Sequence, residues 1–228
     1  MQLSADLIGT LLNARKILLL TGAGMSAESG VPTFRDAQSG LWAKFRPEDL
    51  ATPHAFRADP QVVWDWYAER REQIHKVVPH AGHHALVEME QYFETMLLLT
   101  QNVDGLHQRA GSTGVIELHG NIMRSICSET GKLIDDRWIA SSPGRPPLSP
   151  HHPKGLARPA VVWFGETLPE GAMNRATAAA LECDVFFSIG TSTLVQPAAN
   201  LPFIALNAGA TVIEINPEPT PLSVMADF

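Results

Sequence analysis

A short apolar strand that runs directly into a glycine-rich turn constrains this chain more than any other feature. Residues 18–35 read LLLTGAGMSAESGVPTFR, so the strand is followed at once by small and polar residues. Glycine adopts backbone angles that other residues avoid, and the free amide groups of such a turn can bind phosphate. The spacing departs from the common GxGxxG pattern, because Ser26 and Gly30 follow Gly22 and Gly24. Taken alone, the segment fits a nucleotide-phosphate site and a ligand-free tight turn about equally well.

Length and composition are those of an ordinary globular protein. A chain of 228 residues can bury one sizeable core and carry a small appended module, so we expect one main domain. No apolar run approaches the roughly 18 residues that span a bilayer, and the first residues lack the pattern of a secretion signal. The two cysteines, Cys127 and Cys183, are too few for a disulfide framework. These features predict a cytoplasmic protein.

The net charge bears on the partners of the protein. It is −7 at pH 7, which argues against a protein that coats nucleic acid. The same charge mildly favours the approach of basic, lysine-containing segments. We therefore expect no nucleic acid as a partner, and the lack of a bilayer-spanning apolar run predicts no membrane partner either.

Short apolar runs alternate with segments of helical spacing along the chain. Apolar runs bounded by Gly, Pro, Asn or Thr are typical of buried strands, and their alternation with helices predicts an α/β fold with a Rossmann-like, doubly wound parallel sheet. The expected strands are residues 16–20, 95–100, 160–164, 184–189 and 211–215, and the expected helices are 5–13, 60–76, 81–92 and 173–182.

Polar residues directly follow several of these expected strands. Residues 22–35, 101–104 and 190–192 and the single residue Asn216 each come after an apolar run. In parallel α/β sheets, ligands bind outside the carboxyl ends of the strands. We therefore expect these four groups to line one cleft.

Five segments together resemble the sirtuin family. They are the glycine-rich run, TQNVDGLH at 100–107, LHG at 118–120, VVWFGE at 161–166 and GTS at 190–192, in the family's order. The resemblance implies a Sir2-like, NAD-dependent protein-lysine deacylase, which releases nicotinamide and O-acyl-ADP-ribose and acts on acylated lysine side chains of proteins. It also implies a single catalytic domain over 1–228, with a large lobe of about 1–35, 80–120 and 160–228 and small-lobe insertions of about 36–79 and 121–159.

The resemblance assigns the chemistry to three polar residues. His119 matches the family's general base, which removes a proton from a ribose hydroxyl, and an imidazole titrates in the range that such a base needs. Asn102 and Asp104 match residues that orient the nicotinamide carboxamide or the ribose hydroxyls. A turn that ends the strand is the alternative for Asn102 and Asp104. His107 is expected to be a polar residue at the start of a helix.

Further NAD contacts follow from the same resemblance. Phe34 and Arg35 match a cap over the nicotinamide, where an aromatic face shields the reactive carbon and a guanidinium reaches phosphate. Ordinary turn chemistry is the alternative for Thr191, Ser192 and Asn216. The expected NAD-binding residues are Gly22, Ala23, Gly24, Ser26, Glu28, Thr33, Phe34, Arg35, Gln101, Asn102, Asp104, Gly190, Thr191, Ser192 and Asn216.

The segment VVWFGE resembles the acyl-lysine groove of the family, in which an extended substrate adds as a strand. The expected substrate contacts in this segment are Val161, Phe164, Gly165 and Glu166. Val162 is expected to belong to the core instead.

Tyr67 and Arg70 are three residues apart in an expected helix, so they share one face. The pair matches class III sirtuins, in which a tyrosine hydroxyl and an arginine bind the terminal carboxylate of succinyl- or malonyl-lysine. Ala37 matches the small residue that leaves room for a longer acyl chain. Desuccinylation or demalonylation is therefore expected beside deacetylation, and a solvated Arg70 paired with a helical Glu is the alternative.

The zinc-binding cysteines that are usual in sirtuins are largely missing from this sequence. Sirtuins usually hold zinc with two Cys-x-x-Cys pairs, whereas this chain keeps Cys127 and has Pro150 and Pro153 in place of the second pair. Proline cannot ligate zinc, and neighbouring histidines such as His151 and His152 rarely converge on one tetrahedral ion. We therefore expect no metal. The apolar residues expected to stabilise this segment instead are Leu133, Ile134, Trp138 and Ile139.

Two other functions remain open from the sequence. The same cleft could support ADP-ribosyl transfer or NAD hydrolysis, which nicotinamide release without acyl-lysine would favour. A non-catalytic NAD-binding sensor is the third possibility, and the presence of His119, Asn102 and Asp104 argues against it.

Overall fold

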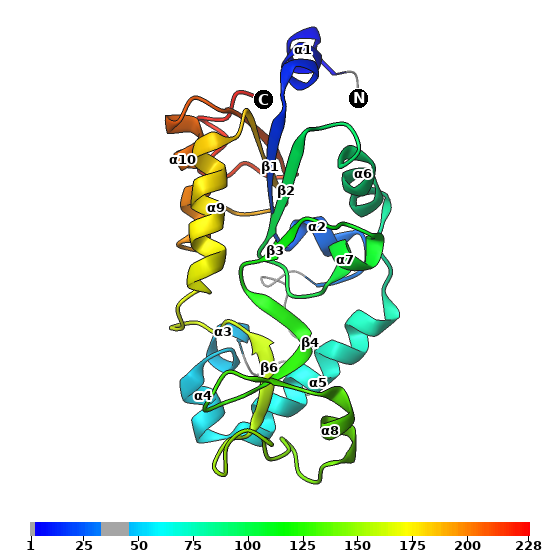
Figure 1. Cartoon of the computed structure of the whole chain (residues 1–228), viewed down its shortest axis with the longest axis vertical. Helices are drawn as coiled ribbons and strands as arrows, with labels where there is room; N and C mark the ends of the chain where they lie inside the picture. Colours follow the sequence, from blue (N-terminus) through cyan, green and yellow to red (C-terminus); the bar gives the residue numbers. More distant parts are fainter. Residues whose placement is uncertain (1–2, 33–45) are drawn as a thin grey trace.

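A five-stranded parallel sheet forms the larger part of the molecule (Figure 1). The structure is a computed structural model that describes residues 3–32 and 46–228. The strand order is β3-β2-β1-β7-β8, and each neighbouring pair is parallel. The strands are β1 (Lys16–Thr21), β2 (Thr95–Thr100), β3 (Val115–Glu117), β7 (Val185–Ile189) and β8 (Thr211–Ile215).

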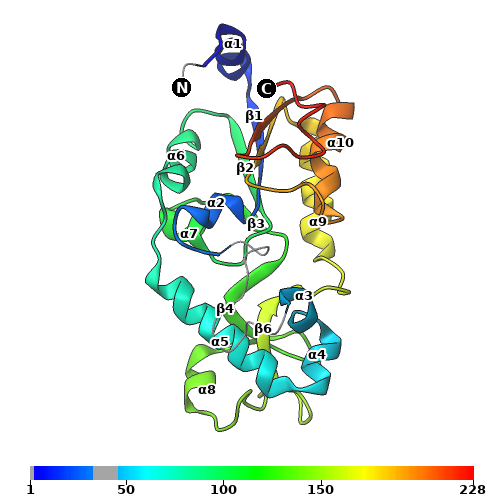
Figure 2. The same cartoon turned by 180° about the vertical axis from the view of Figure 1, so that it is seen from behind.

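Helices cover both faces of this sheet. Figures 1 and 2 show α9 (Glu170–Glu182) and α10 (Leu201–Asn207) on one face, and α6 (Ala81–Met89) with α7 (Leu106–Ala110) on the other. Side chains of β1 alternate between the two faces, so Leu18 and Leu20 join the apolar cluster under α9 and α10. Ile17 and Leu19 join the cluster under α6. The predicted doubly wound α/β fold is confirmed.

A second sheet of three antiparallel strands lies at the other end of the molecule (Figure 1). Its order is β5-β4-β6, from β4 (Gly120–Cys127), β5 (Leu133–Ile134) and β6 (Ala157–Val161). The long helix α5 (Pro60–Lys76) packs on this sheet through Trp66 and Tyr67, which belong to an apolar cluster with Ile122 and Trp163. The remaining helices are α1 (Ala5–Asn13), α2 (Gly24–Ala27), α3 (Pro47–Leu50), α4 (Pro53–Ala58), α5 (Pro60–Lys76), α8 (Asp136–Ser141) and the 3-10 helix η2 (Ala198–Asn200).

The prediction of a strand at 160–164 in the parallel sheet is wrong. The strand here is β6, which starts at Ala157, ends at Val161 and pairs antiparallel with β4 in the second sheet. A turn closes directly after it, because Glu166 N–H donates to the carbonyl of Trp163 and Gly165 adopts a positive φ of 86°. The fifth strand of the parallel sheet is the short strand β3, which was not among the expected strands.

The Cys127 side chain lies at the centre of the segment that lacks the usual cysteines. Burial would raise the pKa of its thiol, but hydrogen bonds from Ser149, Thr130 and backbone amides lower it. Ile134 is buried beside Cys127 and Ile139 packs on this cluster, as expected. Leu133 and Trp138 are exposed and lie outside this cluster, although the Trp138 indole donates to the Leu148 carbonyl over 3.0 Å. Polar contacts to the sulfur and a small apolar cluster stabilise this segment instead.

No helix in the described ranges is both long and apolar enough to cross a membrane. The predicted boundaries of the large and small lobes stay a prediction.

Candidate active site

Two glycine-containing loops meet at the carboxyl ends of β1 and β7. Gly22 N–H donates to the carbonyl of Ile189, and Gly24 N–H donates to that of Gly190, both over 2.9 Å. A Cβ atom on Gly22 would lie 2.7 Å from the Gly190 carbonyl oxygen, and one on Gly190 would lie 2.4 Å from the nitrogen of Met25. The glycines are therefore required for the two loops to approach each other. A direct phosphate contact by Gly22 and Gly24 stays a prediction.

Three of the predicted cofactor residues are linked along this edge of the sheet. Gln101 follows β2 and donates its amide to the hydroxyl of Thr191 over 2.8 Å. Asn216 follows β8 and donates to the carbonyl of Thr191 over 3.0 Å. Loops from β2, β7 and β8 thus converge on Thr191, as the strand-end pattern predicted.

Asn102 and Asp104 are joined through the hydroxyl of Ser26. The Asn102 amide donates to Ser26 Oγ over 3.1 Å and to the carbonyl of Gly22 over 2.9 Å. Ser26 Oγ in turn donates to Asp104 Oδ2 over 2.7 Å. The amide oxygen of Asn102 accepts no hydrogen bond from the described part of the chain, so it can meet an amide or hydroxyl donor of a ligand.

Asp104 also forms the turn that was the alternative to a cofactor contact. Its Oδ1 accepts the Leu106 N–H over 2.8 Å, as in an Asx turn. Burial raises the pKa of this carboxyl, while the hydrogen bonds from Leu106 and Ser26 oppose that rise. The structural role of Asp104 is therefore observed, and its contact with NAD stays a prediction.

His119 lies between β3 and β4, with its side chain beside the carboxyl end of β2. Its Nδ1 is 3.0 Å from the carbonyl oxygen of Gln101. A carbonyl only accepts, so this contact places the proton of the neutral ring on Nδ1 and leaves Nε2 as the basic atom. Burial lowers the pKa of His119, and the hydrogen bond to Gln101 partly offsets that effect. The ring is thus set up to accept a proton at neutral pH.

His107 lies in the first turn of α7, as expected, and its side chain is buried. Its Nε2 is 2.9 Å from the hydroxyl of Thr21, which donates to Thr100 Oγ1 over 2.9 Å. Thr100 Oγ1 also accepts the N–H of Asn102. This chain of contacts anchors the Asn102 loop to the core of the sheet, a role that the sequence did not reveal.

Tyr67 and Arg70 lie on one side of α5, as predicted. The Tyr67 ring is buried, and burial raises its pKa to about 12. The Arg70 guanidinium stacks 5.0 Å from the Trp66 ring centre and has no carboxylate partner among the described residues. Burial lowers the pKa of Arg70. No ion pair between Arg70 and a helical Glu, which was the alternative, is present among the described residues.

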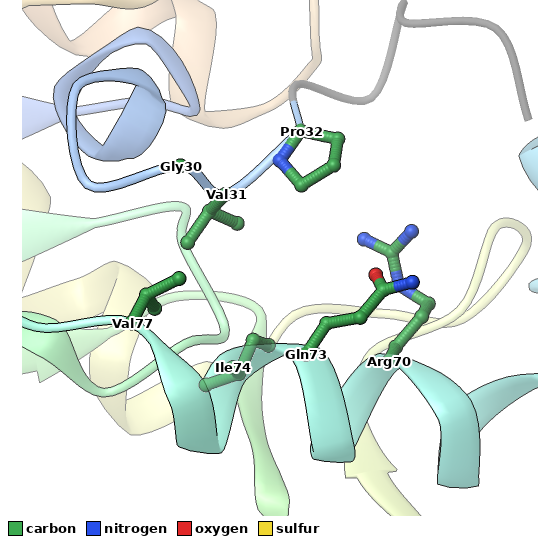
Figure 3. Close-up of a pocket in the computed structure, with 7 residues that line it drawn as sticks. All are labelled: Gly30, Val31, Pro32, Arg70, Gln73, Ile74 and Val77. Carbon is green, nitrogen blue, oxygen red and sulfur yellow. The ribbon is translucent and has the colours of Figure 1, made fainter.

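A narrow pocket separates this part of α5 from the glycine-rich segment (Figure 3). Its free volume is about 10 Å³, and Gly30, Val31 and Pro32 form its other wall. Figure 3 shows Arg70 and Gln73 rising together from α5 toward Pro32. Gln73 was missed from the sequence, although its spacing of three from Arg70 places it on the same face.

The carboxylate of Glu166, a predicted substrate contact, is already bound within the protein. Arg158 donates to both Glu166 oxygens over 2.6 and 2.9 Å, and the Trp163 N–H donates to Oε2 over 2.8 Å. The bidentate ion pair lowers the pKa of Glu166 against the opposing effect of burial. Its direct contact with substrate stays a prediction, but its observed partners lie within the protein.

The other groove residues divide between surface and core. Phe164 and Gly165 are exposed and line an open groove with Thr52, Pro53 and Arg57. Val161 is buried in the cluster with Tyr67, whereas Val162, which was expected in the core, is only half-buried.

The structure also describes three other predicted NAD-binding residues, Ala23, Glu28 and Ser192. Ser192 is half-buried beside Thr191, Ala23 precedes α2, and the exposed carboxylate of Glu28 lies 3.7 Å from His80. Thr33, Phe34, Arg35 and Ala37 lie outside the described residues.

The described parts of the chain contain no group of three or more His, Cys, Asp or Glu side chains placed to hold a metal ion. His151 Nε2 contacts the carbonyl of Leu133 over 2.7 Å, and His152 Nδ1 accepts the N–H of Lys154 over 3.3 Å. Both rings therefore contact the backbone of their own segment.

Comparison with known proteins identifies the family. The model of the Sir2 family matches residues 22–197. An NAD-dependent protein deacylase of Aquifex aeolicus is 54% identical over 214 residues, which cover 93% of this chain and 87% of that protein. One of Ralstonia nicotianae is 52% identical over 224 residues, covering 94% and 86%.

Solved structures agree with these sequence comparisons. A Sir2 homolog–NAD complex superimposes with a TM-score of 0.88 at 45% identity, covering 99% of this chain and 87% of the other. A Sir2–p53 peptide–NAD+ complex gives 0.85 at 30% identity, covering 99% and 91%. This chain therefore belongs to the Sir2, or sirtuin, family.

Proposed function

We propose that this protein removes acyl groups from protein lysines with consumption of NAD, and that succinyl and malonyl groups are among its substrates. Relatives near half identity are NAD-dependent protein deacylases, and a related structure holds a peptide with NAD. These similarities support the general reaction and a protein substrate. The preference for an acidic acyl group rests on this chain's own residues.

The observation that carries this preference is the state of Arg70. It is a half-buried cation beside the buried Tyr67 hydroxyl, and the described residues offer it only the face of Trp66. A cation in such surroundings is costly to leave without an anion, so a carboxylate that enters here is stabilised. A guanidinium binds a planar carboxylate through two parallel hydrogen bonds.

The residues at the strand ends fit NAD in their chemistry. Gln101, Asn102, Thr191 and Asn216 offer uncharged donors and acceptors, which suit ribose hydroxyls and a carboxamide. When bound, NAD supplies the ribose carbon that accepts the acyl oxygen as nicotinamide leaves. The Asn102 amide oxygen, which accepts no hydrogen bond from the described residues, would orient the nicotinamide end of NAD, and Ser26 and Asp104 hold Asn102 in place.

His119 acts as the general base. Its Nδ1–H is held by the Gln101 carbonyl, so its Nε2 lone pair can take a proton from a ribose hydroxyl. The cap expected from Phe34 and Arg35 and the space expected from Ala37 remain proposals for the residues that exclude water and admit the acyl chain.

A matched peptide panel tests the proposal. One peptide sequence carrying acetyl-, butyryl-, succinyl- or malonyl-lysine is incubated with protein and NAD, and mass spectrometry follows the acyl loss. Butyryl and succinyl groups have similar length and differ in the terminal carboxylate. We expect succinyl removal to exceed butyryl removal. If succinyl and malonyl groups are both removed no faster than the butyryl group, Arg70 does not select a carboxylate.

The alternative reactions have separate signatures. Nicotinamide release at the full rate without any acyl-lysine peptide would indicate ADP-ribosyl transfer or NAD hydrolysis. NAD binding without nicotinamide release would indicate a sensor.

A cytoplasmic location, and the absence of nucleic acid and membrane partners, remain proposals from the charge and the first residues of the sequence.

A further inference from the structure

The indole of Trp163 makes the only hydrogen bond that the described residues give to the Tyr67 hydroxyl. The distance from Trp163 Nε1 to the Tyr67 oxygen is 3.0 Å, and both side chains are buried. An indole N–H only donates, so the Tyr67 oxygen must accept. The phenol proton therefore has no acceptor among the described residues.

The orientation of that proton is restricted. A phenol hydroxyl prefers the plane of its ring, where it has two positions. The indole N–H donates to this oxygen over 3.0 Å, so the phenol proton must point away from Trp163 Nε1. Burial raises the pKa of Tyr67 to about 12, so the hydroxyl keeps its proton at neutral pH.

Trp163 is itself held on several sides. The Arg158 guanidinium carbon lies 3.3 Å from the centre of its ring, and the Phe56 ring centre is 5.2 Å away. Its backbone N–H donates to Glu166, which Arg158 binds through both oxygens. The indole therefore has little freedom to turn away from Tyr67.

We propose that Trp163 is a positioning residue for acyl selectivity: its indole N–H fixes the Tyr67 hydroxyl as an acceptor, which directs the phenol proton to the carboxylate of a succinyl or malonyl group beside Arg70. The inference rests on the proposed preference for acidic acyl groups. Trp163 lies in the turn that follows β6, and the role proposed for it acts through its hydrogen bond to Tyr67.

The test removes the indole N–H and keeps the ring. Trp163→Phe is compared with Trp138→Phe as a matched control. Trp138 is an exposed residue of α8, and its indole donates to the Leu148 carbonyl. We expect Trp163→Phe to raise KM for succinyl-lysine peptide about two- to tenfold relative to acetyl-lysine peptide, with the ratio of the two kcat values unchanged. An unchanged KM ratio overturns the inference.

A double-mutant comparison separates positioning from packing. In a Tyr67→Phe background no hydroxyl remains to be oriented, so Trp163→Phe is expected to cause no further loss of succinyl selectivity. An equal loss in both backgrounds shows that Trp163 acts through packing and overturns the inference. If Trp163→Phe fails to fold, site-specific replacement of Trp163 by 3-benzothienylalanine keeps the shape without the N–H, with the same expected KM shift.

Failure of the proposed substrate class can be told apart from failure of the role proposed for Trp163. If wild-type protein shows no preference for acidic acyl groups and Arg70→Met leaves that unchanged, the proposed substrate class fails. If Arg70→Met lowers the succinyl-to-acetyl ratio while both Trp163 replacements leave it intact, only the role of Trp163 fails.

Discussion

His119 and Gln101 are linked by a 3.0 Å contact between the imidazole Nδ1 and a backbone carbonyl oxygen. Gln101 also donates its side-chain amide to Thr191, so one residue connects the base to the loop that follows β7. The contact decides which ring nitrogen is basic, because a carbonyl cannot donate. The end of β2 therefore fixes the position and the tautomer of His119, the proposed base.

Replacing His119 by Ala is expected to reduce deacylation about 10²–10⁴-fold, because the variant lacks the general base. The measurement is kcat with the preferred acyl peptide, beside thermal unfolding to confirm that the fold persists. His75→Ala, on the exposed side of α5, is the matched control. Near-normal turnover by the His119 variant would overturn its assignment as the base.

The pH dependence of the reaction is expected to reflect the lowered pKa of His119. Only the neutral ring accepts a proton, and burial favours that form, so activity is retained as pH falls through the usual histidine value of about 6.5. The acid limb of kcat/KM should therefore lie below that value. An acid limb of kcat/KM centred above pH 6.5, which no substitution of another histidine removes, would contradict this expectation.

Asp104→Asn is expected to separate the cofactor role of Asp104 from its turn. Asparagine can still accept the Leu106 N–H, so the Asx turn and the fold should persist. Loss of the charge should weaken nicotinamide exchange about ten- to a hundredfold if the carboxylate orients NAD. Asn102→Ala should weaken NAD binding and exchange together. Unchanged exchange in folded Asp104→Asn would leave the turn as its whole role.

Buried histidines are expected to make the fold sensitive to acid. Neither ring nitrogen of His83 has a partner in the described structure, and burial, with smaller effects from His107, His80 and His84, lowers its pKa to about 3. Burial lowers the pKa of His107 to about 4. Both folded values lie below the unfolded value, so the unfolded chain binds more protons, and stability present near neutral pH is lost as pH falls below about 6.5.

The measurement is the free energy of unfolding by urea between pH 4 and 7. His83→Gln should reduce the slope of this free energy against pH by about 1.4 kcal/mol per pH unit between the folded and unfolded pKa values of His83. His84→Gln on the exposed side of α6 serves as the control. An identical slope in wild type and His83→Gln would show that His83 is not protonated on unfolding.

The elements with strong local signals could be predicted from the sequence. The helix Pro60–Lys76 and the strands at 95–100 and 211–215 have the predicted bounds. Asp59 caps the long helix through the Val62 N–H, with Pro60 at its first position, as that dipeptide indicates. Neither β3 nor β4 was predicted, because a three-residue strand and the mixed run from 120 to 127 carry no clear periodicity.

For the candidate site, the sequence predicted that residues after several strands lie together, and their contacts with NAD and substrate stay predictions. Strand ends bring Gln101, Thr191 and Asn216 together as the topology requires. The role of Trp163 depends on a contact across 96 positions of sequence, and no local pattern reports such a contact. The sequence did not reveal that Gly22 and Gly190 also let their two loops approach each other, and the predicted phosphate contact of Gly22 and Gly24 stays a prediction.

Arg70→Met tests acyl specificity apart from general catalysis. Methionine keeps much of the apolar stem and removes a charge-assisted contact to a carboxylate, which is worth about 1.5–3 kcal/mol, or one to two decades in relative rate. Acetyl-lysine has no terminal carboxylate, so the ratio of succinyl to acetyl kcat/KM is expected to fall by that factor. Arg137→Met, at an exposed position on α8, is the control. If Arg70→Met loses both activities in equal proportion, Arg70 is structural, and the protein is a general deacylase rather than one selective for acidic acyl groups.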